Sequence, residues 1–169
     1  NDIALVEINP EIKEDRRVTW KEYELIEPTP KTSYRREITW GVFNEKANRF
    51  ANLLLQRGVK KGDKVAILMM NGLEWLPIYF GILKTGALAV PLNFRYSSDE
   101  IEYCVNLAEV DILVFSNPFI GRVEEIADRI SKGRLLIYVG EGCPSFADDY
   151  NSLSANCSSQ SPMVALTDE

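Results

Sequence analysis

From residue 63 onward, the sequence alternates short apolar runs with longer segments of helical apolar spacing. The apolar runs are KVAILMM at 64–70, ALAVPL at 87–92, DILVF at 111–115 and LLIYV at 135–139. They recur at intervals of roughly 23 residues, which leaves room for one amphipathic helix between consecutive strands. Such strand–helix–strand units predict a parallel sheet, and near-continuous apolar strands are typical of a sheet with helices on both faces.

The segments between these strands carry start and stop signals for helices. The helix after the first strand is expected to end at Gly86, and Pro77 predicts that it begins late or kinks. Ser97 and Glu100 have the spacing of a capping box, which predicts the start of the next helix. Pro118 is expected to open the third helix, which runs to about residue 130.

A longer helix is expected before the first strand, with Thr39 as its N-cap and Gly58 at its end. Its inward face is predicted to carry Phe43, Ala47, Phe50, Ala51 and Leu54. Over the whole chain, the side chains predicted to be mostly buried include Trp40, Phe43, Phe50, Ile67, Leu83, Val90 and Ile112.

The N-terminal segment contains two similar stretches, RRVTW at 16–20 and RREITW at 35–40. Each has the composition of a strand, and the turn-rich EPTPKT at 27–32 lies between them. This pattern predicts a β-hairpin arm rather than a repeat array. The C-terminal segment differs, because SANCSSQSP at 154–162 is Ser-rich and polar, as loops and linkers are.

Charge and hydropathy exclude several classes of partner. The 169 residues carry a net charge of −6, which argues against a nucleic-acid surface, since phosphates are met by basic patches. No window approaches the roughly 20 apolar residues of a transmembrane helix. The first residues include Glu7, Glu11 and Asp15 instead of a basic and then apolar signal peptide, so a cytoplasmic location is expected.

The cysteine and histidine content limits the kinds of catalytic site that this chain can form. Cys104, Cys143 and Cys157 make an odd count without metal-like spacing, which indicates reduced thiols in a cytoplasmic protein. The chain contains no His, which excludes Ser–His and Cys–His nucleophile pairs and nearly every catalytic zinc site built from this chain alone.

Ligands of an open parallel sheet bind beyond the carboxyl ends of its strands. The expected strand ends carry Asn71-Gly72, Asn93 and Ser116-Asn117. Neither G-x-G-x-x-G nor G-x-x-x-x-G-K-[ST] occurs, so a dinucleotide-binding domain or a P-loop is not expected. A phospho-accepting receiver domain would need acidic side chains at these ends, whereas Asp111 lies at the start of its strand.

Two residues after the second strand are the candidates for contact with a ligand or cofactor, Asn93 and Arg95. The alternatives are structural: Asn is common at strand-to-helix junctions because it caps helices and tolerates turns, and Arg95 has Asp99 and Glu100 nearby for an ion pair. No residue is assigned a catalytic or a metal-binding role.

Two further groups have both a functional and a structural interpretation. Lys60, Lys61 and Lys64 around Asp63 resemble an anion site, but a solvated turn between helix and strand is the favoured explanation. Cys143 has no base nearby in the sequence, which favours a loop residue over a nucleophile.

The order of these segments resembles the front of the adenylate-forming enzymes, which include acyl-CoA synthetases, luciferases and peptide-synthetase adenylation domains. Residues 38–75 are similar to the family pattern in three places: Thr39-Trp40, the Asn-Arg-x-Ala-x-x-Leu of 48–54, and the Gly-Val-x-x-Gly-Asp-x-Val-Ala of 58–66. The resemblance runs from residue 35 to about residue 139, and its combined spacing is specific.

The stretch GILKTGALAVPLN at 81–93 resembles the second core motif of this family. The matching residues are Leu83, Lys84, Gly86, Val90, Pro91 and Leu92. The stretch ends on Asn93 instead of the Asp that often ends it in peptide-synthetase domains, which favours the acyl-CoA synthetase branch.

The resemblance implies a Rossmann-like three-layer α/β subdomain with a parallel sheet, helices on both faces and an N-terminal β-hairpin arm. The expected division is an arm at 1–34, an α/β subdomain of the AMP-binding domain at 35–150, and a linker at 151–169. By the resemblance, both motifs present are scaffold. The family's Ser/Thr/Gly-rich phosphate loop, adenine motif, ribose-binding Asp and lid Lys come later, and the chain ends on Thr167-Asp168-Glu169 before them.

The resemblance therefore implies a full-length ATP-dependent acid–CoA ligase that uses ATP, Mg²⁺ and CoA, with a carboxylic acid as substrate. The 169 residues alone are expected to bind none of these and to be inactive. Their expected partners are the rest of their own chain, or a second copy through a bared apolar face. The alternative is a free-standing α/β binding or interaction module without catalysis.

Overall fold

The structure is a computed structural model that describes residues 2–9, 17–19, 24–26, 32–130 and 133–165. Its centre is a five-stranded parallel sheet with the strand order β6-β5-β7-β8-β9. The strands are β5 (Lys64–Leu68), β6 (Leu88–Pro91), β7 (Ile112–Ser116), β8 (Leu135–Val139) and β9 (Asp148–Asp149). The four predicted strands are thus present and parallel, and the short β9 adds a fifth.

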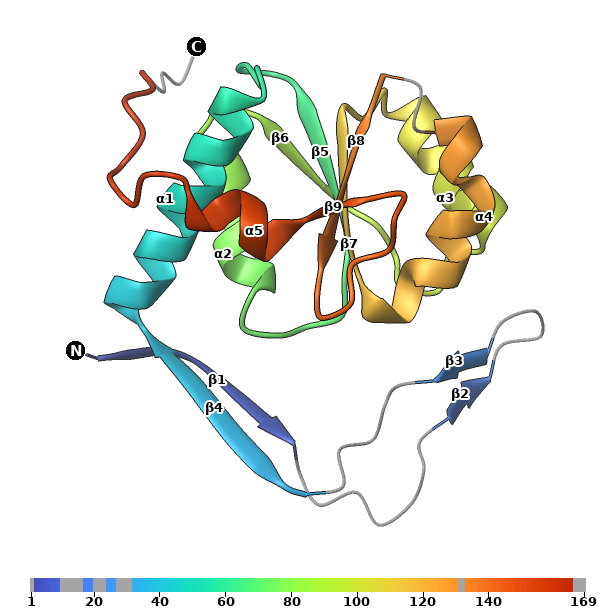
Figure 1. Cartoon of the computed structure of the whole chain (residues 1–169), viewed down its shortest axis with the longest axis horizontal. Coiled ribbons are helices and arrows are strands. Elements are labelled where there is room, and N and C mark those ends of the chain that lie inside the picture. Colours follow the sequence, from blue (N-terminus) through green and yellow to red (C-terminus); the bar gives the residue numbers. More distant parts are fainter. Residues whose placement is uncertain (1, 10–16, 20–23, 27–31, 131–132, 166–169) are drawn as a thin grey trace.

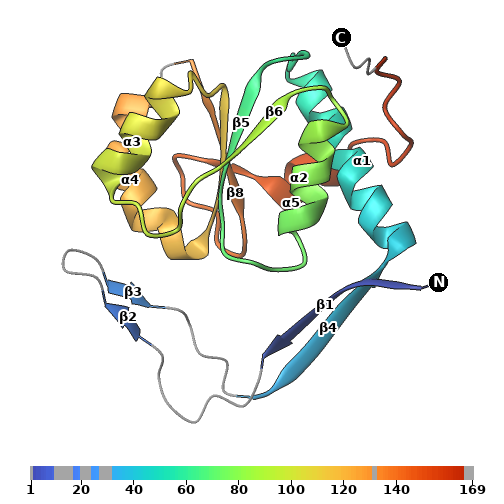
Figure 2. The same cartoon turned by 180° about the vertical axis from the view of Figure 1, so that it is seen from behind.

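Helices cover both faces of the sheet. Figures 1 and 2 show α1, α2 and α5 on one face and α3 and α4 on the other. The helices are α1 (Trp40–Gln56), α2 (Trp75–Leu83), α3 (Ser98–Leu107), the 3₁₀ turn η1 (Asn117–Phe119), α4 (Ile120–Ile130) and α5 (Tyr150–Ala155). This arrangement confirms the predicted α/β class.

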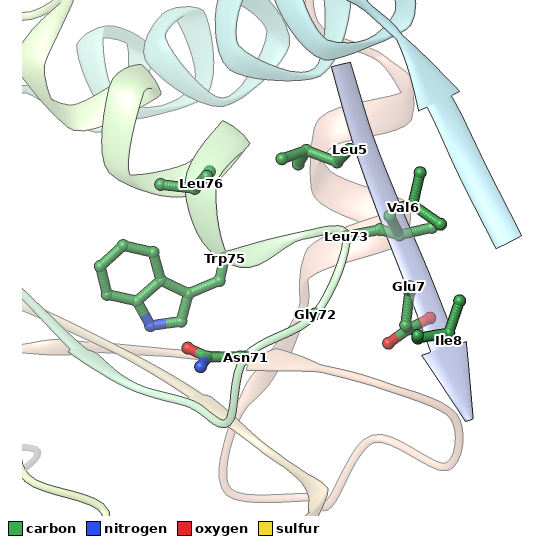
Figure 3. A pocket seen from close by; sticks show the side chains of 9 residues that line it. All are labelled: Leu5, Val6, Glu7, Ile8, Asn71, Gly72, Leu73, Trp75 and Leu76. Carbon is green, nitrogen blue, oxygen red and sulfur yellow. The ribbon is translucent and has the colours of Figure 1, made fainter. Parts of the chain in front are cut away.

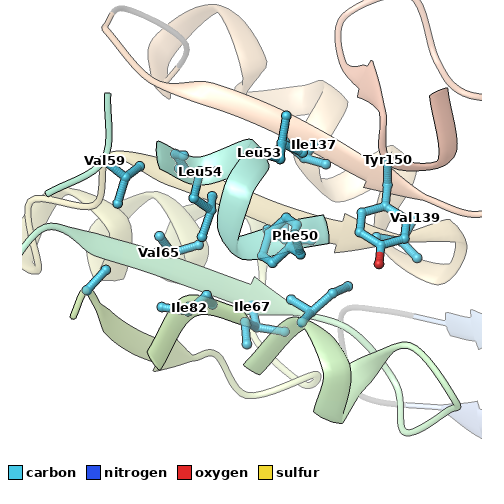
Figure 4. Packing of buried hydrophobic residues seen from close by; sticks show 14 of the residues in the cluster. Phe50, Leu53, Leu54, Val59, Val65, Ile67, Ile82, Ile137, Val139 and Tyr150 are labelled. Carbon is cyan, nitrogen blue, oxygen red and sulfur yellow. The ribbon is translucent and has the colours of Figure 1, made fainter. Parts of the chain in front are cut away.

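The strands divide their side chains between two apolar cores, because successive residues of a strand point to opposite faces. Val65 and Ile67 of β5 pack in the core under α1 and α2, which Figure 4 shows together with Phe50 and Leu54. Ala66 of β5 belongs to the core under α3 and α4. All five side chains are 0–1% exposed, which explains why the strands are apolar on both faces.

The helix signals in the sequence are confirmed. Thr39 is the N-cap of α1, and its Oγ1 accepts a hydrogen bond from Val42 N at 3.3 Å. The capping box of α3 is present, with Ser97 N donating to Glu100 Oε2 at 2.8 Å and Glu100 N to Ser97 Oγ at 3.2 Å. Because α2 begins at Trp75, Pro77 lies in its first turn, where no intrahelical bond is lost.

The N-terminal arm is antiparallel as predicted, but its strand pairing differs from the prediction. The segment at 34–39, β4 (Tyr34–Thr39), pairs with β1 (Ile3–Asn9), while β2 (Arg17–Thr19) pairs with β3 (Glu24–Ile26). Pairing β2 with the nearby β3 closes a shorter loop than pairing it with β4. Most of the predicted turn at 27–32 lies outside the described residues.

Burial follows the prediction at helix and strand centres and fails at helix ends. Phe43, Phe50, Ile67 and Ile112 are buried, and Val90 is half-buried. Trp40 and Leu83 were predicted to be buried but are 59% and 38% exposed. Trp40 is the first residue of α1 and Leu83 the last of α2, so neither lies over the sheet as the central turns do.

The segment predicted to be a linker, 151–169, contains most of α5 and then lies against α1 as far as residue 160. Tyr34, placed in the arm by the sequence, opens β4, which leads directly into α1. The division at 34 and 150 remains a prediction.

Candidate functional site

The carboxyl ends of β5, β7 and β8 meet at one edge of the sheet, which faces the arm in Figure 1. A cavity of about 380 Å³ lies at this edge. Asn71, Ser116 and Asn117 line it, as expected for residues at parallel strand ends. Glu7 and Arg36 of the arm line it as well. Their participation was not predicted, because nothing local in the sequence indicates where the arm folds back.

A second, more apolar groove of about 540 Å³ lies between β1 and the segment at 71–76. Figure 3 shows Leu5 and Val6 on β1 opposite Leu73, Trp75 and Leu76. The arm approaches this segment closely, because a Cβ added to Gly72 would lie 3.2 Å from Glu7 Oε1. Gly72 therefore permits the contact that closes the groove on one side.

Two ion pairs lie near this edge. Arg36 Nη2 lies 2.8 Å from Glu7 Oε2, across the β1–β4 pair. Lys46 Nζ of α1 lies 2.6 Å from Glu74 Oε1, whereas Glu74 Oε2 is buried and makes no hydrogen bond to the described part of the chain. Burial, and then the charge of this carboxylate, raise the pKa of Tyr150. This phenol therefore stays protonated at neutral pH.

Asn93 and Arg95 lie in the turn after β6, at the same edge of the sheet but outside both cavities. Asn93 Oδ1 accepts a hydrogen bond from Arg95 N at 3.0 Å, and Tyr96 N donates to Asn93 O at 3.0 Å. The guanidinium of Arg95 lies over the Phe94 ring at 5.2 Å. Asn93 thus has the turn-forming role considered from the sequence. A ligand contact by either residue remains a prediction.

A buried arginine, which the sequence did not indicate, holds this turn against α4. Arg122 is 8% exposed, and its Nη1 donates to the carbonyl oxygens of Phe94 and Tyr96, each at 2.8 Å. Its guanidinium also lies over the Phe119 ring at 5.5 Å. Arg122 therefore fixes the position of the loop that carries Asn93 and Arg95.

The basic cluster lies at the amino end of the sheet, away from the two cavities near the carboxyl edge, and Asp63 at its centre lines a separate cavity of about 320 Å³. Asp63 Oδ2 accepts from Lys60 N at 2.7 Å, and Lys64 N donates to Asp111 Oδ2 at 2.9 Å. Lys64 Nζ lies 3.4 Å from Glu109. These contacts match a turn between helix and strand, the structural alternative.

Cys143 lies in the loop after β8, and its thiol lies 3.3 Å from the carbonyl oxygen of Ala147. Burial, followed by the charges of Asp149 and Asp148, raises the pKa of this thiol. A raised pKa lowers the thiolate fraction at neutral pH, which argues against a nucleophile.

The motif at 81–93 is the junction of α2 with β6. Thr85 is buried; its Oγ1 donates to Ile82 O at 2.7 Å and accepts from Ala87 N at 3.2 Å. Lys84 Nζ reaches back to α1 and donates to Asn44 Oδ1 at 2.9 Å and to Asn48 Oδ1 at 2.8 Å. The conspicuous lysine of the motif thus connects two helices.

A triphosphate and its Mg²⁺ would need cations and grouped carboxylates at the carboxyl edge of the sheet. Two cationic side chains near this edge, Arg36 and Lys46, are each paired with a carboxylate, and the guanidinium of Arg95 lies over the Phe94 ring. Within the described ranges, no three Asp, Glu, Cys or His side chains come together as a metal site. Among the helices that the structure describes, none combines the length and apolar character needed to cross a bilayer.

The fold and the motifs agree with a sequence-family match. The profile of the AMP-binding enzyme family matches residues 8–165. The chain belongs to the AMP-binding enzyme family. The match confirms the resemblance inferred from residues 35–139 and extends it into the arm.

Individual relatives are CoA ligases for different acids. The chain is 35% identical over 114 residues to the medium/long-chain-fatty-acid/3-oxocholest-4-en-26-oate–CoA ligase of Mycolicibacterium smegmatis, covering 68% of the chain and 20% of the ligase. It is 35% identical over 115 residues to the crotonobetaine/carnitine–CoA ligase of Salmonella typhimurium, covering 68% and 22%.

The solved structure of another CoA ligase has a similar fold. The crystal structure of the anthranilate CoA ligase AuaEII in complex with anthranoyl-AMP superposes with a TM-score of 0.70 and 27% identity, covering 74% of this chain and 24% of that one. The chain spans about a fifth of the length of the curated relatives it matches.

Proposed function

We propose that these residues belong to an ATP-dependent acid–CoA ligase. In this reaction the substrate carboxylate attacks the α-phosphorus of ATP, which gives an acyl-adenylate and releases pyrophosphate. The thiol of CoA then attacks the acyl carbonyl carbon, which forms the thioester, loses the thiol proton and releases AMP. The observation that carries this proposal is the AMP-binding family match over residues 8–165.

Within this enzyme, we assign the 169 residues the role of a scaffold that makes and breaks no bonds. The polar side chains of the family motifs support this role, because they bind other parts of the chain. Lys84 bonds Asn44 and Asn48, and Asn48 in turn bonds the backbone of Ser159. ATP and Mg²⁺ need donors aligned with the phosphates, and the pairing of Arg36 and Lys46 with carboxylates supports the scaffold role.

The substrate is proposed only as a carboxylic acid together with CoA. The names of the relatives cover a fatty acid or steroid acid, a betaine and an aromatic acid. Acids this different share the carboxylate that reacts. A cytoplasmic location, expected from the composition and from the three free thiols, is part of the same proposal.

The proposed partner of the scaffold is the remainder of the same polypeptide. An aromatic face on α1 and α2 supports this: Trp40 packs against Phe43 at 5.6 Å, and Phe43 against Phe80 at 5.6 Å. Phe80 is 43% exposed and Leu83 38%. The matched relatives are about five times as long as the matched region, so further chain is available to cover this face. Left uncovered, it favours self-association of the isolated residues.

The test is carboxylate-dependent exchange of pyrophosphate into ATP. We expect exchange by the product of the complete gene with one of three acids, namely a long-chain fatty acid, carnitine or anthranilate, and none by residues 1–169. Exchange by residues 1–169 would refute the scaffold role. Absence of exchange and thioester formation by the complete protein with all acids, together with retained binding of one acid, would favour the non-catalytic binding module instead.

A further inference from the structure

The segment that follows α5 is held to α1 almost entirely by side chains. The carbonyl oxygens of Ala155, Cys157, Ser158, Ser159 and Gln160 all accept hydrogen bonds from three residues of α1. This segment is Ser-rich and largely polar, so apolar burial gives it little reason to dock. The contact therefore depends on the donors that α1 presents.

Arg49 and Asn52 each make two of these hydrogen bonds. Arg49 Nη1 donates to Ala155 O at 3.1 Å and to Cys157 O at 2.6 Å. Asn52 Nδ2 donates to Ser158 O at 2.8 Å and to Gln160 O at 2.9 Å. Backbone carbonyl groups at the end of a helix and just after it have no partner in a helix or a sheet, and side-chain donors can satisfy them.

Asn48 completes the group and is oriented by Lys84. Its Oδ1 accepts from Lys84 Nζ at 2.8 Å, so its amide nitrogen points the other way and donates to Ser159 O at 2.8 Å. Asn48 is 2% exposed, and a buried amide is retained only where its polar atoms are bonded. The lysine of the core motif thus acts on the segment at 155–160 through Asn48.

One apolar contact lies in the middle of the segment. Cys157 is 4% exposed and packs in the core beside α1. Its thiol lies 3.3 Å from Leu153 O and 3.7 Å from Gln56 Oε1. The thiol can be reached by a reagent only when the segment lifts from α1.

We propose that Asn48, Arg49 and Asn52 form an anchor that fixes where the chain leaves the α/β unit. The anchor holds residues 155–160 in one conformation and thereby sets the direction of everything that follows. Its catalytic consequence rests on the proposed ligase function: the phosphate-handling part of the enzyme would be positioned against the scaffold through this anchor. These three are positioning residues, since they are assigned no contact with substrate.

The test uses Cys157 as a reporter in the 169-residue chain. Asn52→Leu keeps the branching and the number of side-chain heavy atoms and introduces a good helix former, but it removes both N–H donors; Asn52→Ala removes the side chain beyond Cβ. Asn44→Ala is the matched control, because Asn44 lies on the same helix and bonds Lys84 but not the segment. Changes at Arg49 are avoided, because burial raises the pKa of Cys157 and the charge of Arg49 partly offsets this, so removing that charge would alter thiol reactivity directly.

The measurement is the rate of alkylation at each cysteine by peptide mass spectrometry, with Cys104 and Cys143 as internal references. We expect Asn52→Leu and Asn52→Ala to increase the rate at Cys157 about tenfold, equivalent to about 1.4 kcal/mol, by making local opening easier. Asn44→Ala should leave it unchanged. Equal rates in wild type and both Asn52 variants would overturn the anchor.

The second measurement tests whether the anchor positions the phosphate-handling part of the complete enzyme. Asn52→Leu should lower kcat for pyrophosphate exchange at an unchanged KM for the acid and an unchanged melting temperature, with Asn44→Ala as control. Unchanged kcat beside accelerated labelling would overturn the positioning role. If the wild-type enzyme exchanges no pyrophosphate with any acid, the ligase proposal fails, and the labelling result alone still decides whether the anchor exists.

Discussion

Gly81, two residues before the second core motif begins at Leu83, lies where α2 crosses α1 at close range. A Cβ added at Gly81 would lie 2.9 Å from Ala47 O, 3.0 Å from Phe50 Cδ1 and 3.1 Å from Phe50 Cβ. All three distances are below the roughly 3.5–4.0 Å of an optimal carbon contact. We therefore predict that Gly81→Ala destabilises the fold, although alanine is the better helix former.

Two opposing contributions determine how far Gly81→Ala lowers the free energy of unfolding. Replacing Gly by Ala within a helix contributes about 1 kcal/mol of stability. Overpacking costs about 1–3 kcal/mol, and we expect the upper value here, because one neighbour is a backbone carbonyl of α1 and Phe50 is fully buried. The difference is a loss of about 2 kcal/mol in the free energy of unfolding.

The assay is urea unfolding of the 169-residue chain, followed by far-ultraviolet circular dichroism. With a slope of about 2 kcal/mol per molar urea, the midpoint should fall by about 1 M at an unchanged slope. Gly121→Ala in α4 is the control, because an added Cβ there has no neighbour within 4 Å. It should leave stability unchanged or raise it by up to about 1 kcal/mol. A Gly81→Ala variant as stable as wild type would refute the packing argument.

Three further predictions concern caps, buried hydroxyls and titration. Ser97→Ala should lower the free energy of unfolding by about 1 kcal/mol, because it removes half of the α3 capping box, while Ser145→Ala on an exposed loop should not; urea midpoints compare the two. Thr85→Val keeps the shape but loses two buried hydrogen bonds, so unfolding should become easier by about 1–3 kcal/mol, and an unaltered midpoint would contradict this role. The pKa of Tyr150 is raised in the folded state, so above the ordinary value of 10.0 the unfolded chain loses this proton first and stability falls as pH rises. Tyr150→Phe should therefore flatten the alkaline decline of the urea midpoint, and a decline as steep as that of the wild type would contradict this reasoning.

The sequence by itself predicted the four longer strands of the sheet and the helices α1 to α4 in their order, but not β1, β9 or α5. Strand runs, helix faces, the Thr39 cap and the Ser97–Glu100 capping box were all predicted within a few residues. These features depend on contacts between residues close in the sequence and on the regular spacing of apolar residues along a strand or helix. Both can be read directly from the sequence. The sequence also predicted that the asparagines after the strands lie at one edge of the sheet, because parallel strands end at a common edge.

Only the tertiary structure decided how distant segments meet. The pairing of β4 with β1 instead of β2, the exposure of Trp40 and the approach of Glu7 to Gly72 have no local signal. The same holds for Arg49 and Asn52, whose partners lie more than 100 positions away. An amide or guanidinium bonds any backbone carbonyl equally well, so the residue type does not specify the partner. The folded chain makes that choice by bringing α1 and the segment after α5 together, since this supplies donors to carbonyl groups that no strand or helix satisfies.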